Sequence, residues 1–161
     1  MSKKGVFDID KGWSKVMREM KRATEVVVDV GVQAGEKAGT KDHVSLAAEQ
    51  GIDLVGIAVI NEFGTENIPS RPFMRQSFDQ NINELDNFMQ SVGDRIILNR
   101  ISAGQGLNLV GKKMTGIIQK QIVDGSWTLN TVQTVLQKGS DKPLIDTGRL
   151  RQSIRHVVKP K

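Results

Sequence analysis

The tripeptide Asp146-Thr147-Gly148 carries the catalytic carboxylate in aspartic proteases, and it stands here between apolar residues as it does in those enzymes. Such catalysis needs two of these loops facing each other, so that two carboxylates share one proton. This chain has one, and Arg149 follows it where those enzymes place a small residue. A homodimer could supply a second loop. We expect a structural role instead, in which Asp146 or Thr147 caps a short helix and Gly148 allows the sharp entry.

Other residue types that catalyse reactions or bind metals are sparse. His43 and His156 are the two histidines, and we expect both at the surface. They leave little for a Ser-His-Asp arrangement or a histidine metal site. Carboxylates such as Asp29, Asp53 and Glu62 could hold a metal ion, but no spacing selects a set. We therefore predict no catalytic, metal-binding or cofactor-binding residue, no cofactor and no small-molecule substrate.

Length and composition indicate the kind of fold that must position these residues. A chain of 161 residues, 38% of them apolar, can bury one core, so we expect a single domain over residues 1–161. It has no cysteine, so packing alone must hold the fold, which suits a reducing cytoplasm. No apolar run approaches the roughly 18 residues that would span a bilayer, and we expect no membrane contact.

Positive charge gathers near the C-terminus. The formal net charge is +5, and residues 138–161 hold seven Lys and Arg against two Asp. A basic segment of this kind can face DNA phosphates or an acidic partner. The candidates for facing DNA or a partner protein are Arg149, Arg151, Arg155, Lys159 and Lys161.

Apolar periodicity predicts the elements of the N-terminal part. We expect a helix over residues 11–22, capped by Asp10. Its apolar face carries Trp13, Val16, Met17 and Met20. Residues 25–32 are β-branched and predict a strand. The polar stretch 33–52 predicts a mobile loop, because long loops without secondary structure are usually functional or disordered.

The rest of the chain predicts mainly helix. Spacing and end signals indicate helices over residues 53–63, 81–100, 107–124 and 130–138, the last capped by Asn130. The two longest are one bent helix or a hairpin. Residues 154–158 predict a strand, with Leu150 and Ile154 turned inward. Because two strands rarely form a stable sheet, we expect a third near residues 71–79 or within 33–52. The class is α+β: a small antiparallel or mixed sheet packed against two long amphipathic helices, with an N-terminal helix.

Aromatic side chains are expected mainly in the core. Phe63, Phe73 and Phe78 are predicted to be buried there. Trp13 and Trp127 are predicted to pack in the core or, as the alternative, to anchor an interface.

Five residues are candidates for contacts between subunits. Arg71 is predicted to pair with Glu62, or else to contact a neighbouring subunit. An exposed strand can pair with a strand of another chain, which makes the strand at residues 25–32 the other candidate. Its alternating valines are Val26, Val28, Val30 and Val32.

Two blocks of sequence, taken together, resemble a known family. The first is N-E-F-G-T at residues 61–65 followed by I-P-S-R-P-F-M-R at 68–75, and the second is K-G-S-D-K-P-L-I-D-T-G-R-L-R-Q-S-I at 138–154. In this order and spacing they resemble the bacteriophage neck and tail-completion proteins, which include the Mu-type virion morphogenesis family. The resemblance spans roughly residues 52–157.

The resemblance implies a structural virion protein and not an enzyme. Such a protein assembles in the bacterial cytoplasm and forms a homo-oligomeric ring at the head-tail junction of a tailed phage. The ring is expected to be a hexamer, and a ring of twelve subunits is the alternative. There it completes the neck or tail, contacts other neck and tail proteins, and lets genomic DNA pass without sequence specificity. The alternative from another class is a free DNA-binding accessory protein that uses the basic C-terminus.

Overall fold

The structure, a computed structural model, describes residues 12–33, 53–146 and 148–161. The predicted cap Asp10 and, apart from Gln33, the predicted loop 33–52 lie outside the described residues. The elements in chain order are α1 (Trp13–Thr24), β1 (Val26–Val32), α3 (Leu54–Phe63), α4 (Phe73–Ile97), α5 (Ala103–Asp124), α6 (Val132–Lys138), α7 (Arg149–Ser153) and β2 (Ile154–Pro160). The predicted α+β class is confirmed.

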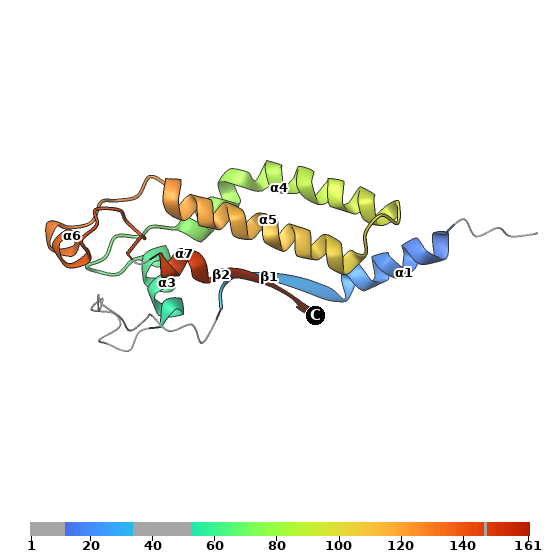
Figure 1. Cartoon of the computed structure of the whole chain (residues 1–161), viewed down its shortest axis with the longest axis horizontal. Helices are drawn as coiled ribbons and strands as arrows, with labels where there is room; N and C mark the ends of the chain where they lie inside the picture. The colour runs from blue at the N-terminus through green and yellow to red at the C-terminus, as the bar shows by residue number, and fades with distance from the viewer. Residues whose placement is uncertain (1–11, 34–52, 147) are drawn as a thin grey trace, which may run out of the picture.

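The elements form layers in an elongated molecule (Figure 1). The helix α5 lies on the two-stranded sheet, and α4 packs antiparallel on α5. The short helices α3 and α7 contact each other and β1 at one end of the sheet. α1 and α6 lie at opposite ends of the long axis. Within the described ranges, no helix combines the length and apolar character that crossing a membrane requires.

The sheet pairs the N-terminal and C-terminal parts of the chain. β1 and β2 run antiparallel, from Val26 opposite Pro160 to Val32 opposite Ile154. Among the described residues no third strand joins them. The third strand expected near residues 71–79 is wrong for that stretch, which begins α4. The long helix α5 covers the apolar face of the pair and so supplies the burial that two strands alone lack.

The two long helices form a hairpin, one of the two predicted alternatives. Ser102 starts α5 with a reciprocal capping box, in which its side chain and that of Gln105 each accept the other's backbone N–H. Gly106 lets the helices approach closely, since a Cβ atom there would lie 2.8 Å from side-chain atoms of Val92 and Ile96. The hairpin is therefore held by packing along its length.

The core gathers side chains from both halves of the chain. Phe73, Ile118, Ile122 and Ile154 are almost fully buried, and Leu150 packs with them, so the predicted inward positions of Leu150 and Ile154 are confirmed. Their cluster joins α4, α5, α7 and β2. The core therefore depends on segments distant in sequence.

The aromatic predictions are only partly right. Phe73 has no exposed surface, but Phe63 and Phe78 are 66% and 49% exposed. Trp127 is half-buried against the core, while Trp13 is 67% exposed. The helix faces that carry Phe63, Phe78 and Trp13 are exposed to solvent, which propensity alone cannot reveal.

The short helix after the Asp-Thr-Gly tripeptide begins differently from the prediction. Gly148, not Asp146, is its N-cap, and it adopts a left-handed conformation with φ of 76°. No side chain caps the helix, and Asp146 is exposed. Thr147 lies outside the described residues. The predicted sharp entry at Gly148 is confirmed, because glycine adopts this conformation without steric cost.

The buried ring of Phe73 offers a direct test of this core. Phe73→Ala should lower the free energy of unfolding by about 3–5 kcal/mol, because it removes a fully buried ring and leaves a cavity. The matched control is Phe78→Ala on the same helix, where the half-exposed ring should matter far less. Urea denaturation followed by circular dichroism measures both. Equal losses would contradict the assigned core.

Candidate functional site

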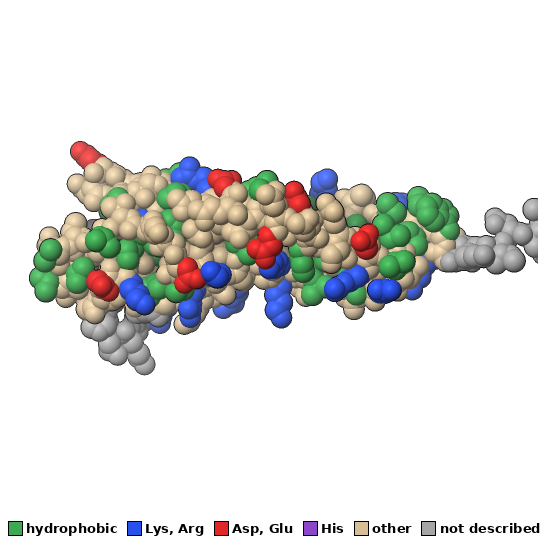
Figure 2. Space-filling view, turned by 90° about the horizontal axis from the view of Figure 1, so that it is seen from above, with side chains coloured by type: hydrophobic (Ala, Val, Ile, Leu, Met, Phe, Trp, Pro, Cys, Tyr) green, Lys and Arg blue, Asp and Glu red, His purple; other side chains and the backbone are tan. Residues whose placement is uncertain are grey.

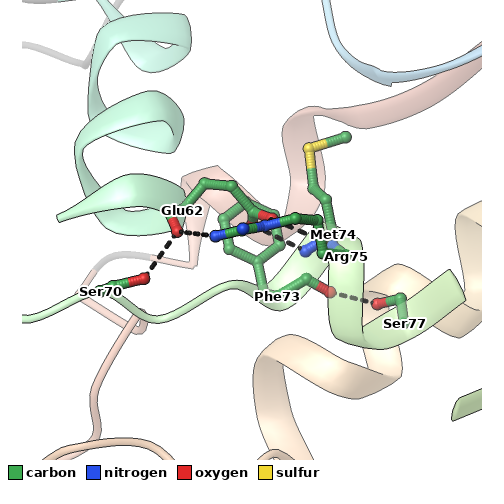
Figure 3. Close-up of polar contacts among 6 residues, drawn as sticks. All are labelled: Glu62, Ser70, Phe73, Met74, Arg75 and Ser77. Carbon is green, nitrogen blue, oxygen red and sulfur yellow. Dashed lines mark hydrogen bonds and ion pairs between the residues drawn. The ribbon is translucent and has the colours of Figure 1, made fainter. Parts of the chain in front are cut away.

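The first motif block closes on itself around one buried carboxylate. Glu62, at the C-terminal end of α3, is only 5% exposed. Its carboxylate accepts hydrogen bonds from the backbone N–H groups of Met74 (2.9 Å) and Arg75 (3.0 Å), in the first turn of α4 (Figure 3). Because Pro72 at the N-cap makes no side-chain capping bond, Glu62 takes the place of the cap. The C-terminal end of α3 therefore lies against the N-terminal end of α4.

Arg75 completes this arrangement. Its Nε donates to the Glu62 carboxylate (3.1 Å), and its Nη2 donates to the Glu62 backbone carbonyl (3.1 Å). The same carbonyl accepts from Ser70 Oγ (2.8 Å). The predicted ion pair between Glu62 and Arg71 is thus wrong, since Arg75 is the cation beside the carboxylate (Figure 3). A residue one helical turn further on has the geometry to reach back along α4.

Arg71 instead joins this region to the loop between α5 and α6. Its Nε donates to the Thr128 carbonyl (2.9 Å), and its Nη2 donates to Asn130 Oδ1 (3.1 Å). Its backbone N–H donates to the Asn61 carbonyl (2.6 Å). Burial lowers the pKa of Arg71 through desolvation, yet a guanidinium stays charged at neutral pH. The side chain, only 6% exposed, lies within its own chain and does not present itself to a neighbouring subunit.

Asn130 is therefore used differently from the prediction. The helix α6 is capped by Thr131, whose side-chain oxygen accepts from the backbone N–H of Thr134 (3.3 Å). Asn130 accepts from Arg71 and donates to the Asp141 carbonyl (3.3 Å). It fastens the end of the loop rather than the start of the helix.

The glycine and threonine of the block form its turn. Gly64 has φ of 77°, and a Cβ atom there would lie 2.8 Å from the backbone nitrogen of Ser70. Thr65 Oγ1 accepts from the backbone N–H of Ile68 (3.1 Å). Only glycine fits such a close approach of two backbones. Together, these residues form what we call the clasp: Asn61, Glu62, Gly64, Thr65, Ser70, Arg71 and Arg75.

Phe63 stands apart from the clasp although it lies inside the motif. Its ring is exposed, and the Arg75 guanidinium lies over it at 5.1 Å from the ring centre. Val59, one turn earlier on α3, is half exposed beside it. An exposed ring held by a cation is a contact candidate, since aromatic residues are enriched in interfaces. Sequence reasoning missed it by assigning the ring to the core.

The strand predicted to contact a neighbour points its valines inward. Val28 lies close to Gly111 of α5, and Val30 and Val32 pack against the core. By strand alternation Val26 shares this face. All four are half-buried. Only the outer main-chain edges of β1 and β2 lack a pairing strand within the described ranges, so the predicted contact through this strand would run through backbone groups.

The basic C-terminal candidates lie at the surface. Arg149 and Arg151 are exposed on α7. Arg155 and Lys159 alternate with His156 and Val158, which face α5, so β2 presents the two cations on its outer face, and Lys161 follows directly after the strand. Lys159 forms an ion pair with Asp29 of β1. The sheet thus brings three of the five predicted residues into one row.

Of the residues that suggested catalysis, the structure describes His156 and Asp146. His156 is half-buried against α5, so it lies only partly at the surface where it was predicted, with Nε2 2.8 Å from Asn108 Oδ1 and Nδ1 3.3 Å from Thr115 Oγ1. His43 lies outside the described residues. Asp146 is exposed to solvent. In the parts of the chain that the structure describes, no group of three His, Cys, Asp or Glu residues could hold a metal ion.

A hollow of about 410 Å³ lies between α5 and α7. Its walls include Gln119, Val123, Arg151 and the ion pair of Lys120 with Asp124. The hydrogen bond from Lys120 to Asp124 raises the pKa of this lysine. A satisfied surface pair at an open hollow favours a structural reading of these residues.

The clasp predicts a specific cost for losing the Glu62 charge. Glu62→Gln keeps the shape but places an amide where two backbone N–H groups and Arg75 donate, so unfolding free energy should fall by about 2–3 kcal/mol. The control is Glu84→Gln, which removes an exposed carboxylate paired with Lys113 and should cost at most about 1 kcal/mol. Chemical denaturation measures both. Similar small losses would contradict the clasp.

Comparison with known proteins adds no relative. No model of a protein family, no curated protein and no solved structure matches this chain. The resemblance to phage neck proteins therefore depends on the two sequence blocks alone.

Proposed function

We propose that this chain is a structural virion protein that forms a ring at the head-tail junction of a tailed bacteriophage, where it completes the neck or tail. One observation carries the proposal. The two blocks that resemble the phage neck proteins pack into one core, in which Phe73 of the first block joins Leu144, Leu150 and Ile154 of the second. Because the two blocks pack against each other, their residues serve the fold of the chain, as expected for a structural protein.

The polar residues of the first block support this reading. The clasp residues hydrogen-bond within the chain and fasten the ends of α3, α4 and the α5–α6 loop together. A catalytic motif would instead aim reactive groups at a pocket. These residues serve the rigidity of the subunit.

Exposed apolar side chains support assembly with other proteins. At one end of the molecule, Leu129, Val132 and Leu136 are 76–79% exposed on and beside α6. At the other end, α1 exposes Trp13. Large exposed apolar groups that gather in patches mark interaction sites. An elongated subunit with such patches at both ends fits a component of a larger assembly (Figure 1).

The location of the chain in phage particles tests the proposal. When lysates of the phage that encodes it are fractionated on a density gradient, the chain should sediment with tails or whole virions. Disruption of its gene should leave heads and tails unjoined. Mass spectrometry of the fractions and electron microscopy measure the two effects. A chain found solely among free proteins, with virions intact in its absence, would contradict the proposal.

The basic row on β2 supports the second candidate, a free DNA-binding accessory protein. Such a protein would lose affinity steeply as salt rises, because its Lys and Arg release counterions from the phosphates. Under the ring proposal we expect the free chain to bind DNA weakly, with a dissociation constant no tighter than about 10⁻⁶ M at physiological salt.

Fluorescence anisotropy with duplex DNA separates the candidates. Under the ring proposal, Arg155→Glu should change this weak DNA binding little. Nanomolar binding that Arg155→Glu weakens strongly would favour the accessory protein. Arg95→Glu, which changes the same charge at an exposed position of α4 outside the basic row, is the control.

A further inference from the structure

The helix α1 is held in a fixed orientation at the tip of the α4–α5 hairpin. Its buried side carries Val16 and Glu19. The Glu19 carboxylate accepts from the backbone N–H of Ala103, the first residue of α5, at 2.8 Å, and from Arg22 Nη1 at 2.9 Å. The hydrogen bond from Ala103 holds the pKa of Glu19 below its usual value, with Arg22 adding to the effect. The exposed sides of α1 are thereby presented to solvent in a defined orientation.

That exposed side is an apolar stripe with a basic flank. Trp13, Met17 and Met20 follow one another at helical spacing and are 67%, 48% and 48% exposed. Lys21 stands one turn after Met17, and Arg18 lies beyond it on the same flank. Neither cation has an ion-pair partner within the described ranges. We call these five residues the α1 stripe.

Helix α4 carries a second apolar surface, with an acidic flank. Phe78, Ile82 and Met89 lie on one side of the helix and are 42–49% exposed. Asp86 stands one turn after Ile82, and Asp79 lies two turns before Asp86, so both edge the same flank. Both are exposed and lack an ion-pair partner among the described residues. We call these five residues the α4 flank.

Figure 2 views the molecule from the side on which α4 lies. Acidic side chains are spread along the helix, and apolar side chains gather at the α1 end with basic ones beside them. The α1 stripe and the α4 flank have the same composition: each has three large apolar residues edged by two charged residues that lack an ion-pair partner among the described residues. The charges are opposite in sign.

The two surfaces cannot meet within one chain. Phe78 lies about 28 Å along α4 from its end at Ile97, at 1.5 Å per residue, and α1 is fixed beyond that end by Glu19. A second copy of the chain can bring them together. On both helices the charged flank lies on the same rotational side of the apolar residues, so antiparallel packing sets Arg18 and Lys21 opposite Asp79 and Asp86.

We propose that the α1 stripe of one copy packs antiparallel on the α4 flank of a second copy. The proposal rests on the proposed function, because it names the contact through which the ring closes. The contact joins two different surfaces, so each copy offers one and receives the other. Contacts of this kind generate rings when the rotation between copies closes.

Cross-linking tests the contact directly, since the natural chain has no cysteine. Met17→Cys and Ile82→Cys, prepared as separate proteins and mixed, should form a covalent dimer with a short bis-maleimide. Each single variant alone should give little. The control replaces Ile82→Cys with Leu136→Cys, which is exposed on α6 and outside both surfaces. Should the control pair cross-link equally well, the contact is not specific.

Charge exchange provides an independent test. Lys21→Glu and Asp86→Lys should each weaken self-association by at least about ten-fold, because each sets like charges against each other. An equal mixture of the two variants should recover it, since alternating copies restore every opposite-charge pair. Light scattering after size-exclusion chromatography measures assembly, and circular dichroism confirms that the exposed substitutions leave the fold intact.

The outcomes separate this contact from the proposed function. If the chain assembles and neither the cysteine pair nor the charge variants affect it, the ring closes through another surface and the contact is refuted. If the purified chain stays monomeric, the cysteine pair is assayed in phage particles, where failure to cross-link refutes it equally. A chain absent from particles overturns the proposed function itself.

Discussion

The fold depends on one buried carboxylate placed at the start of a helix. Glu62 accepts from the first-turn N–H groups of α4 and from Arg75, so it satisfies backbone donors that Pro72 leaves without a cap. A buried charge is costly unless hydrogen bonds and a counter-ion surround it, and here both are present. Arg71 ties the same junction to the α5–α6 loop. The end of α3, the start of α4 and this loop are therefore held together around Glu62 and Arg71.

The clasp explains why a block of polar residues appears in an otherwise ordinary helical protein. Asn61, Gly64, Thr65 and Ser70 each complete a turn or a hydrogen bond that α3 and α4 require. Once these residues have structural roles, the exposed side chains become the functional candidates. They are large, apolar and placed at the ends and along one side of an elongated molecule, and the proposed assembly role is built on them.

Helical periodicity predicted the long helices and the α+β class well, because amphipathic spacing directly reports which face is buried. The start of α4 was misplaced, since its cap comes from Glu62 in another helix. Phe63, Phe73 and Phe78 look alike in sequence, yet of the three only Phe73 is buried. Contacts made across loops, such as that of Arg71 with Thr128, depend on the path of the whole chain, and local spacing does not encode them.

The proposed contact between copies joins unlike surfaces on α1 and α4 of one chain. Electron cryomicroscopy of the head-tail junction in intact virions tests this idea most directly. The account predicts a closed ring of this chain around the axis, with α1 of each copy lying against α4 of the next. A junction whose rings are built wholly from other proteins would contradict it.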